Sequence, residues 1–407
     1  MKARYVEQGA SRYVAGKVTQ FDQKNEMFCR PLWDETQLDL GKKFYMTEVP
    51  PKNKPGYELK GQSLVNASWH LENIFAQGVA GGRMGIYAWE WDKIFEYPLV
   101  PMGSKINPDN PAGTTRDIKK AAAFFGAGQV GVCKLDRRWL YSAAFPLRDV
   151  KSMSNEVPDR YQYAIAIAIE MDYQAIGCSP TSPSSAATGL GYSKMAFTAG
   201  LLAHYIRGLG YQAVACGNDT ACSIPIAIDA GLGELARNGL LITPTHGPRV
   251  RLAKVLTDLP LVPDRPIEFG VWDFCMQCEK CAVKCPSQSI RYGKPTDQPN
   301  NISNREGLYR WPINAETCLA FWAANGTDCS NCIRSCPFNK PPGWLHDTVR
   351  WGIRNYPRLN PFFLWMDDVC GYGRQKTPGS FLADTGKPVW LTVHVITQSA
   401  EGIGLIQ

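Results

Sequence analysis

The chain has 407 residues, of which 44% are hydrophobic and 20% are charged. That balance is typical of a folded globular enzyme and excludes a disordered or fibrous chain. The formal net charge of +7 is spread along the sequence and does not indicate nucleic-acid binding, and no apolar run reaches the roughly 18 residues of a membrane span.

The N-terminal region, residues 1–110, is rich in Pro, Gly and aromatic residues and has weak periodicity, which predicts loops and turns. Short helices are expected around Leu64–Gln77. The aromatic residues around Trp89 can line a pocket, although packing inside a core is the commoner role of such side chains.

Between residues 111 and 269 the pattern predicts helices that alternate with strands. The predicted helices are Thr115–Phe125 and Ser184–Leu209, and the predicted strands are Gln129–Leu135, Tyr161–Glu170, Gln212–Cys216 and Val250–Leu256. Alternation of this kind predicts a sheet with helices packed on it.

One glycine run in this region fits the dinucleotide-binding spacing G-x-G-x-x-G, with glycines at Gly126, Gly128 and Gly131. A dinucleotide site needs a strand before the glycines and a helix after them, so that the helix N-terminus meets the pyrophosphate. Here the predicted helix comes first and the strand follows. We therefore interpret the run as the end of a helix, and NAD is not predicted.

Cysteine placement is the strongest feature of the sequence. Eight of the 14 cysteines lie between Cys275 and Cys336, where C-x2-C-x2-C-x3-C-P is followed by an imperfect repeat. The first run has the spacing of bacterial ferredoxins that hold two clusters, in which the fourth cysteine ligates the other cluster. Two structural zinc sites are the alternative, but paired C-x2-C motifs would not need the x3-C-P ending.

This spacing predicts two [4Fe–4S] clusters with crossed ligands. The first cluster is assigned to Cys275, Cys278, Cys281 and Cys336, and the second to Cys318, Cys329, Cys332 and Cys285. The remaining cysteines are expected to be buried free thiols: Cys29, Cys133, Cys178, Cys216, Cys222 and Cys370.

The last segment, residues 346–407, is rich in Trp and Pro, and its alternating run Val389–Ile396 predicts an edge strand. Haem is disfavoured because the sequence has no C-x-x-C-H and only five histidines, and neither a P-loop nor HExxH is present. The length outside the cluster segment therefore predicts a housing for a second group that receives the electrons.

The runs Ile224–Arg251 and Thr257–Leu261, together with the cysteine motifs, resemble the corrinoid-dependent respiratory reductive dehalogenases. The resemblance implies an α+β fold, with a nitroreductase-like cobalamin-binding α/β core and a bacterial two-[4Fe–4S] ferredoxin-like module. The absence of D-x-H-x-x-G from this sequence fits a base-off corrinoid with no protein ligand on its lower face.

The resemblance also implies a division of the chain. Residues 111–269 would form the cobalamin-binding core and residues 270–345 the ferredoxin-like module. Residues 1–110 would cover the core and contribute to the substrate pocket, and residues 346–407 would complete the core.

In that family a tyrosine donates the proton, assisted by a basic residue and an asparagine, and the matching positions are Tyr192, Arg251 and Asn218. A phenol is a weak acid in water, and a guanidinium beside it stabilises the phenolate, which is the physical reason for the pairing. Arg249 is the rival of Arg251 for this role. Packing is the ordinary role of a single tyrosine, and only the joint match favours catalysis.

Further positions follow from the same resemblance. The substrate pocket is assigned to Trp322, Tyr45 and Trp89, with core packing an equal alternative for Trp322. The expected cofactor-binding residues are Gly189, Gly191, Gly231, Gly233, Thr245 and Gly247.

The implied activity is replacement of halogen by hydrogen in a small organohalide, with a chlorinated alkane or alkene favoured by the aromatic residues. Implied partners are a small membrane-anchor protein and a respiratory electron donor, without nucleic acid; a homodimer is allowed. The implied location is the outer face of the cytoplasmic membrane after export by the twin-arginine route, with the leader absent from this chain. A cytoplasmic location is the alternative.

Two other functions compete with this interpretation. An enzyme similar to epoxyqueuosine reductase would share cobalamin and paired clusters but would act on tRNA with a carboxylate acid, and a basic groove would be expected. A ferredoxin-type electron carrier with an accessory domain would need no corrinoid. The tyrosine at the donor position and the lack of a concentrated Lys/Arg run favour the dehalogenase.

Overall fold

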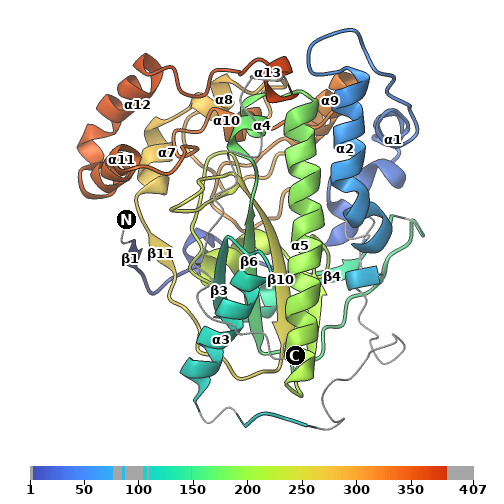
Figure 1. The fold of residues 1–407 in the computed structure, drawn as a ribbon, viewed down its shortest axis with the longest axis vertical. Helices are drawn as coiled ribbons and strands as arrows, with labels where there is room; N and C mark the ends of the chain where they lie inside the picture. The colour runs from blue at the N-terminus through green and yellow to red at the C-terminus, as the bar shows by residue number, and fades with distance from the viewer. Residues whose placement is uncertain (1–2, 77–84, 88–103, 108–109, 148, 383–407) are drawn as a thin grey trace, which may run out of the picture.

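The computed structural model describes residues 3–76, 85–87, 104–107, 110–147 and 149–382 (Figure 1). Trp89 and the predicted strand Val389–Ile396 lie outside these residues. Within them a central sheet carries helices on its sides, and the cysteine-bearing helices gather at one end of the molecule. The mixture of helices and sheet confirms the predicted fold class.

The central sheet has four strands, and every neighbouring pair is antiparallel. In spatial order the strands are β3 (Gln129–Lys134), β6 (Tyr163–Glu170), β10 (Val250–Thr257) and β7 (Ala213–Cys216). All four were predicted, with ends that differ by no more than two residues. The long pair β6 and β10 forms the centre of the sheet.

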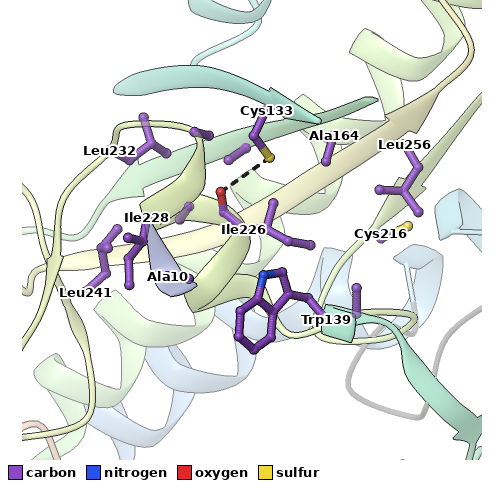
Figure 2. Close-up of a cluster of buried hydrophobic side chains, with 14 of the residues drawn as sticks. Ala10, Cys133, Trp139, Ala164, Cys216, Ile226, Ile228, Leu232, Leu241 and Leu256 are labelled. Carbon is purple, nitrogen blue, oxygen red and sulfur yellow. Dashed lines mark hydrogen bonds between the residues drawn. The ribbon is translucent and has the colours of Figure 1, made fainter. Parts of the chain in front are cut away.

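Strand β6 separates two cores because its large and small residues alternate. Ile165, Ile167 and Ile169 pack in one cluster with helix α5, as a period of two requires. The alanines between them face the opposite side of the sheet, where Trp139 and Ile226 fill a second cluster (Figure 2). Small residues on that face leave room for the large indole.

Helix α5 (Ser182–Gly208) runs along the isoleucine face of the sheet (Figure 1). Ala196, Ala199 and Ala203 recur at helical spacing and are buried there, so the helix lies close to the strands. Helix α3 (Pro111–Phe124) packs beside it, and Gly126 follows with φ of +106°. The predicted helix end at the glycine run is therefore confirmed.

The N-terminal region contains more helix than predicted. Helix α2 (Leu59–Leu71) packs along α5 and begins five residues before the predicted start. Helix α1 (Leu38–Tyr45) was not predicted; it is short, contains Gly41 and packs against a cysteine-bearing helix. Tertiary packing supplies the stability that so short a helix lacks by itself.

The cysteine-bearing segment consists of four short helices joined by loops. These are α7 (Val271–Gln277), α8 (Lys280–Val283), α9 (Ala315–Asn325) and α10 (Asn331–Arg334). Helices α11 (Trp344–Asn355) and α12 (Asn360–Val369) flank α7, and α13 (Gly379–Leu382) follows.

The remaining elements are short. They are α4 (Tyr173–Gly177), α6 (Ser223–Asp229), β1 (Arg4–Tyr5), β2 (Phe21–Asp22), β4 (Tyr141–Ala144), β5 (Met153–Ser154), β8 (Glu234–Leu235), β9 (Leu241–Ile242) and β11 (Ile267–Glu268). Among the helices described, none has the length and apolar character needed to cross a membrane.

Candidate functional site

Tyr192 lies in the first half of α5, on the side of the helix that also carries Thr188 and Met195. The Trp69 ring of α2 stacks on the Tyr192 ring, with centroids 4.9 Å apart and an interplanar angle of 22°. Two helices that pack along each other therefore hold the phenol ring between them.

Asn218 follows the end of β7, and its side-chain amide Nδ2 donates to the Tyr192 hydroxyl oxygen at 2.8 Å. The loop that carries it is held by Asp219, whose Oδ1 accepts the backbone N–H of Gly217 at 2.7 Å. Asp219 is 1% exposed. The predicted asparagine and tyrosine are therefore in direct contact, and a buried carboxylate fixes the loop between them and the sheet.

Arg251 approaches the same tyrosine from β10. Its guanidinium carbon lies 5.0 Å from the centroid of the Tyr192 ring, and its Nη2 donates to Thr188 Oγ1 at 3.0 Å. A Cβ on Gly191 would stand 2.8 Å from Arg251 Cγ, so glycine at that position lets the arginine pass along α5. The positive charge lies over the ring face, where a phenolate would gain from it.

Arg249, the rival of Arg251, has a different environment. Its side chain is 1% exposed, and its guanidinium donates to Glu170 Oε1 at 2.5 Å, to Asn339 Oδ1 at 3.0 Å and to the Met171 carbonyl. Hydrogen bonds from His246 and Arg249 lower the pKa of Glu170 to about 2. Arg249 therefore forms an ion pair with Glu170, whereas Arg251 lies against the ring of Tyr192.

Tyr192, Asn218 and Arg251 line a pocket of about 370 Å³. Trp322 of α9 and Tyr45 of α1, both predicted for the substrate pocket, line it as well. The Tyr45 hydroxyl donates to the Phe28 carbonyl at 2.6 Å, so this side chain presents its ring to the pocket. Other described lining residues come from the N-terminal region and α5, and include Phe28, Phe44, Trp69 and Ser185.

Several polar atoms of this pocket have no protein partner. Within the described part of the chain, Arg251 Nε, Trp322 Nε1 and both carboxylate oxygens of Asp328 are buried without a hydrogen bond. Buried polar groups ordinarily have partners. A large ligand with amide or hydroxyl groups would satisfy these atoms, and the aromatic walls would cover its apolar parts.

The predicted cofactor-binding glycines serve close packing. A Cβ on Gly189 would stand 2.3 Å from Trp69 Cδ1, so this glycine admits the indole that stacks on Tyr192. A Cβ added at Gly231, Gly233 or Gly247 would stand within about 2.6 Å of a backbone carbonyl oxygen. None of these three lines the pocket around Tyr192.

Thr245 also lies apart from the pocket lining, and its hydroxyl accepts from Gln129 Nε2 at 2.5 Å.

The first predicted cysteine set is brought together. Cys275, Cys278, Cys281 and Cys336 line one small cavity. Burial raises the pKa of the Cys278 thiol to about 11 and that of Cys336 to about 12. Ligation to iron replaces the proton of such a thiol, so the donor set fits a cubane cluster.

A buried arginine accompanies this set. The Arg237 side chain is fully buried and donates to the carbonyl oxygens of Cys275 at 2.7 Å and Cys278 at 2.9 Å. Its guanidinium carbon lies 4.8 Å from the Trp311 ring centroid. A cluster with four thiolate ligands carries negative charge, and this cation would offset part of it.

The second set is grouped in the same way. Burial, followed by the nearby sulfurs of Cys329 and Cys285, raises the pKa of Cys318 to about 12. Burial also raises the pKa of Cys332 well above its usual range, again with Cys329, Cys318 and Cys285 contributing. Cys318, Cys329, Cys332 and Cys285 therefore lie within electrostatic reach of one another, and their ligation of one cluster stays a prediction.

Outside the two sets, one expectation is wrong. Cys370, expected to be buried, is exposed at the end of α12, and Cys222 is partly buried. The other four are buried as predicted.

Trp69 and Glu26 are among the pocket residues that the sequence analysis missed. Trp69 lies within the predicted helix Leu64–Gln77, so the sequence indicated its helical position but not its contact with α5. Glu26 lies in an irregular segment with no motif, and only the fold brings it to the pocket.

Comparisons with known proteins agree with this geometry. Residues 274–339 match the family described as a 4Fe-4S double cluster binding domain. The chain is 37% identical over 361 residues to the tetrachloroethene reductive dehalogenase of Sulfurospirillum multivorans, which covers 81% of this chain and 72% of that protein. A tetrachloroethene reductive dehalogenase of Desulfitobacterium hafniense is 38% identical over 332 residues, with 72% of this chain and 60% of that protein covered.

The structure superposes on a solved catabolic reductive dehalogenase in complex with 3-bromo-4-hydroxybenzoic acid, with a TM-score of 0.70 and 23% identity. That likeness covers 92% of this chain and 50% of the other, and it shows the fold. An epoxyqueuosine reductase of Bacillus subtilis is 28% identical over 130 residues, which are 28% of each chain.

The chain thus spans between about half and three quarters of the length of these dehalogenases. The likeness to the Sulfurospirillum protein extends over most of both sequences. The chain belongs to the reductive dehalogenase family.

Proposed function

We propose that this chain reduces a small organohalide and replaces its halogen by hydrogen, R–X + 2 e⁻ + H⁺ → R–H + X⁻. The observation that carries the proposal is the contact of Tyr192 with Asn218 and Arg251 at a pocket that Trp322 and Asp328 of the cysteine segment also line. A proton donor and an electron route thus meet at one cavity.

We propose that the pocket holds a corrinoid. One structure in this fold family concerns B12-dependent dehalogenation. The aromatic walls of the pocket and the unpartnered atoms of Arg251, Trp322 and Asp328 fit a ligand with apolar parts and amide groups. A bound corrinoid supplies a cobalt centre that accepts electrons and reacts with carbon–halogen bonds.

The chain's own residues would manage the proton. Tyr192 would give its hydroxyl proton to the substrate carbon, and the guanidinium of Arg251 over the ring would stabilise the phenolate left behind. The Asn218 amide, which donates to the hydroxyl oxygen, would strengthen that hydrogen bond as negative charge develops. Trp69 would keep the ring in one orientation.

The two cysteine sets would form the electron route. Trp322 and Asp328 line the pocket and lie in the same segment as Cys318 and Cys329, so the second cluster would stand next to the pocket. Cys332 and Cys336 link the sets along one short helix and its end. Electrons would enter at the first cluster and leave the second toward the pocket.

The substrate class follows from the pocket walls and the relatives. Rings of Phe28, Phe44, Tyr45, Trp69 and Trp322 line the pocket and suit an apolar molecule. The two bacterial relatives are named for tetrachloroethene. We therefore propose a chlorinated alkene or alkane as substrate.

The remaining assignments are proposals of the same kind. A small membrane-anchor protein and a respiratory electron donor would be the partners, and the enzyme would work at the outer face of the cytoplasmic membrane. Residues 111–269 would form the cobalamin-binding core, residues 1–110 would cover it and contribute to the substrate pocket, residues 346–407 would complete it, and residues 270–345 would be the ferredoxin-like module.

The test is anaerobic reconstitution with iron, sulfide and a corrinoid, followed by metal analysis and a chloride-release assay with a reduced viologen. We expect one cobalt for each pair of four-iron clusters, and chloride release that requires the corrinoid. Chlorinated ethenes, ethanes, methanes and phenols form the substrate panel. Protein that binds iron but no cobalt, or that releases chloride from none of these compounds, would overturn the proposal.

A further inference from the structure

A second carboxyl group on the pocket, in the N-terminal region, has no part in the reaction described so far. Glu26 lines the same pocket as Tyr192 and follows a short helical turn. Its Oε1 accepts a hydrogen bond from the hydroxyl of Tyr141, a β4 residue that is 4% exposed. The carboxyl group is therefore held in a fixed position, with one face toward the pocket.

The charges around Glu26 come from several elements. Burial raises the pKa of Glu26 to about 7, against the Tyr141 hydrogen bond and the charge of Lys254, which lower it. Asp219 raises it further. The thiols of Cys29 and Cys222 also lie within electrostatic reach and are themselves held protonated by burial.

Tyr45 and Arg305 are the other titratable or charged side chains in these surroundings. Burial raises the pKa of Tyr45 and the charge of Glu26 adds to the rise, whereas burial raises the pKa of Cys222 and the charge of Arg305 lowers it.

Lys254, whose charge acts on Glu26, also contacts the loop that carries Asn218. Lys254 of β10 is 1% exposed, and its Nζ donates to the Gly217 carbonyl and to Ser223 Oγ at 3.1 Å. Asn218, the next residue, donates to the Tyr192 hydroxyl. Lys254 thus connects the surroundings of Glu26 to the loop that holds the proton donor.

The direct neighbours of Tyr192 cannot replace its proton. A side-chain amide such as that of Asn218 does not ionise, and arginine side chains in proteins do not act as proton donors to a phenolate. Each turnover consumes one proton, so another titratable group must return it to the phenolate. A group of this kind needs access to both the pocket and water, and Lys43 and Tyr45 bring the pocket to the surface of the molecule.

We propose that Glu26 is the residue that returns the proton to Tyr192 after each turnover. The step breaks the O–H bond of the Glu26 carboxylic acid and forms the O–H bond of the Tyr192 phenol, through water in the pocket. The Glu26 carboxylate then takes a proton from solvent, and no electrons move. The inference rests on the proposed function, in which Tyr192 donates the proton.

The test uses the reconstituted holoenzyme and the pH profile of chloride release. The wild-type kcat should fall as pH rises through about 7, because the acid form of Glu26 is lost. Glu26→Gln should lower kcat about tenfold at pH 6 and abolish this limb of the profile. Tyr141→Phe removes a hydrogen bond that lowers the pKa of Glu26. The pKa of Glu26 should therefore rise, and the fall of kcat in this variant should move to higher pH.

Glu35→Gln is the matched control, since Glu35 is an exposed carboxylate of the same segment, and it should keep the wild-type profile. A Glu26→Gln enzyme with the wild-type limb and kcat would overturn the proposal, as would a Tyr141→Phe limb that does not move.

A second readout does not depend on turnover. Infrared difference spectra of the full chain, titrated between pH 5 and 9, should show a carboxylic-acid carbonyl band that disappears near pH 7 and is missing in Glu26→Gln. Absence of that band in the wild type contradicts the relay. A titrating band in a protein that releases no chloride would instead show that the proposed function fails while the acid is present.

Discussion

Arg249 and Arg251 show how strongly the environment separates two identical side chains. Residues two positions apart on a regular strand point to the same face of the sheet. Arg249 precedes the first residue of β10, so its side chain need not share the face of Arg251. Arg251 shares its face with Ala253 and Val255, which pack against α5, and so it reaches Tyr192. Arg249 turns instead to Glu170 and Asn339.

We expect replacement of Arg249 to affect mainly stability and replacement of Arg251 to affect mainly activity. Arg249→Gln should lower the free energy of unfolding by about 2 kcal/mol, because the partners of a buried guanidinium lose their hydrogen bonds. Arg251→Gln should leave thermal unfolding nearly unchanged and reduce chloride release by at least about tenfold. Thermal unfolding and kcat, measured on both variants, check this expectation; loss of stability in Arg251→Gln with full activity would contradict it.

At the residue scale, the sequence was sufficient for the cysteines and insufficient for Glu26. Cysteine ligands are predictable because cluster geometry fixes their spacing along a short loop. The meeting of Tyr192, Asn218 and Arg251 could be expected from the family resemblance. Glu26 contacts Tyr141, a residue 115 positions away, and no local pattern encodes such a pair.

Helices α2 and α5 form the frame of Tyr192, the proposed proton donor. Their contact places Trp69 on Tyr192, and it depends on Gly189 because an added Cβ would stand 2.3 Å from the indole. Glycine within a helix costs roughly 1 kcal/mol relative to alanine, so its position in α5 is explained by packing. Near the other end of the same helix, Gly208 has open space where a Cβ would project.

These glycines provide a matched pair of variants. Gly189→Ala should lower the free energy of unfolding by about 1–3 kcal/mol and reduce chloride release, because the indole must move from the tyrosine. Gly208→Ala should be neutral or slightly stabilising, with full activity. Thermal unfolding and tryptophan fluorescence would measure the difference, and equal behaviour of the two variants would show that Gly189 does not position Trp69.

At the element scale, periodicity predicted the long helix α5 and the four central strands because each buries one face or both against a regular neighbour. Helix α1 was missed because its eight residues contain a glycine, and α2 was placed too late in the sequence. Both belong to the N-terminal region, where contacts with other parts of the chain determine the structure more than local pattern does.

Across the whole molecule, the cysteine segment and the pocket form one continuous arrangement. The first cysteine set surrounds a cavity beside the buried Arg237, and Cys332 and Cys336 join it to the second set. Helix α9 carries both Cys318 and Trp322, so it borders a cluster site and the pocket together. Under the proposed function, electrons and the proton would therefore reach the pocket from different elements.

The most direct test of this account is the rate of chloride release from tetrachloroethene by the reconstituted Tyr192→Phe enzyme. Tyr205→Phe, on the same helix, serves as the control because Tyr205 is not among the pocket residues. We predict a loss of about 100-fold or more for Tyr192→Phe at unchanged cobalt and iron content, and wild-type rates for Tyr205→Phe. Wild-type release by Tyr192→Phe would contradict the central claim that this tyrosine supplies the proton.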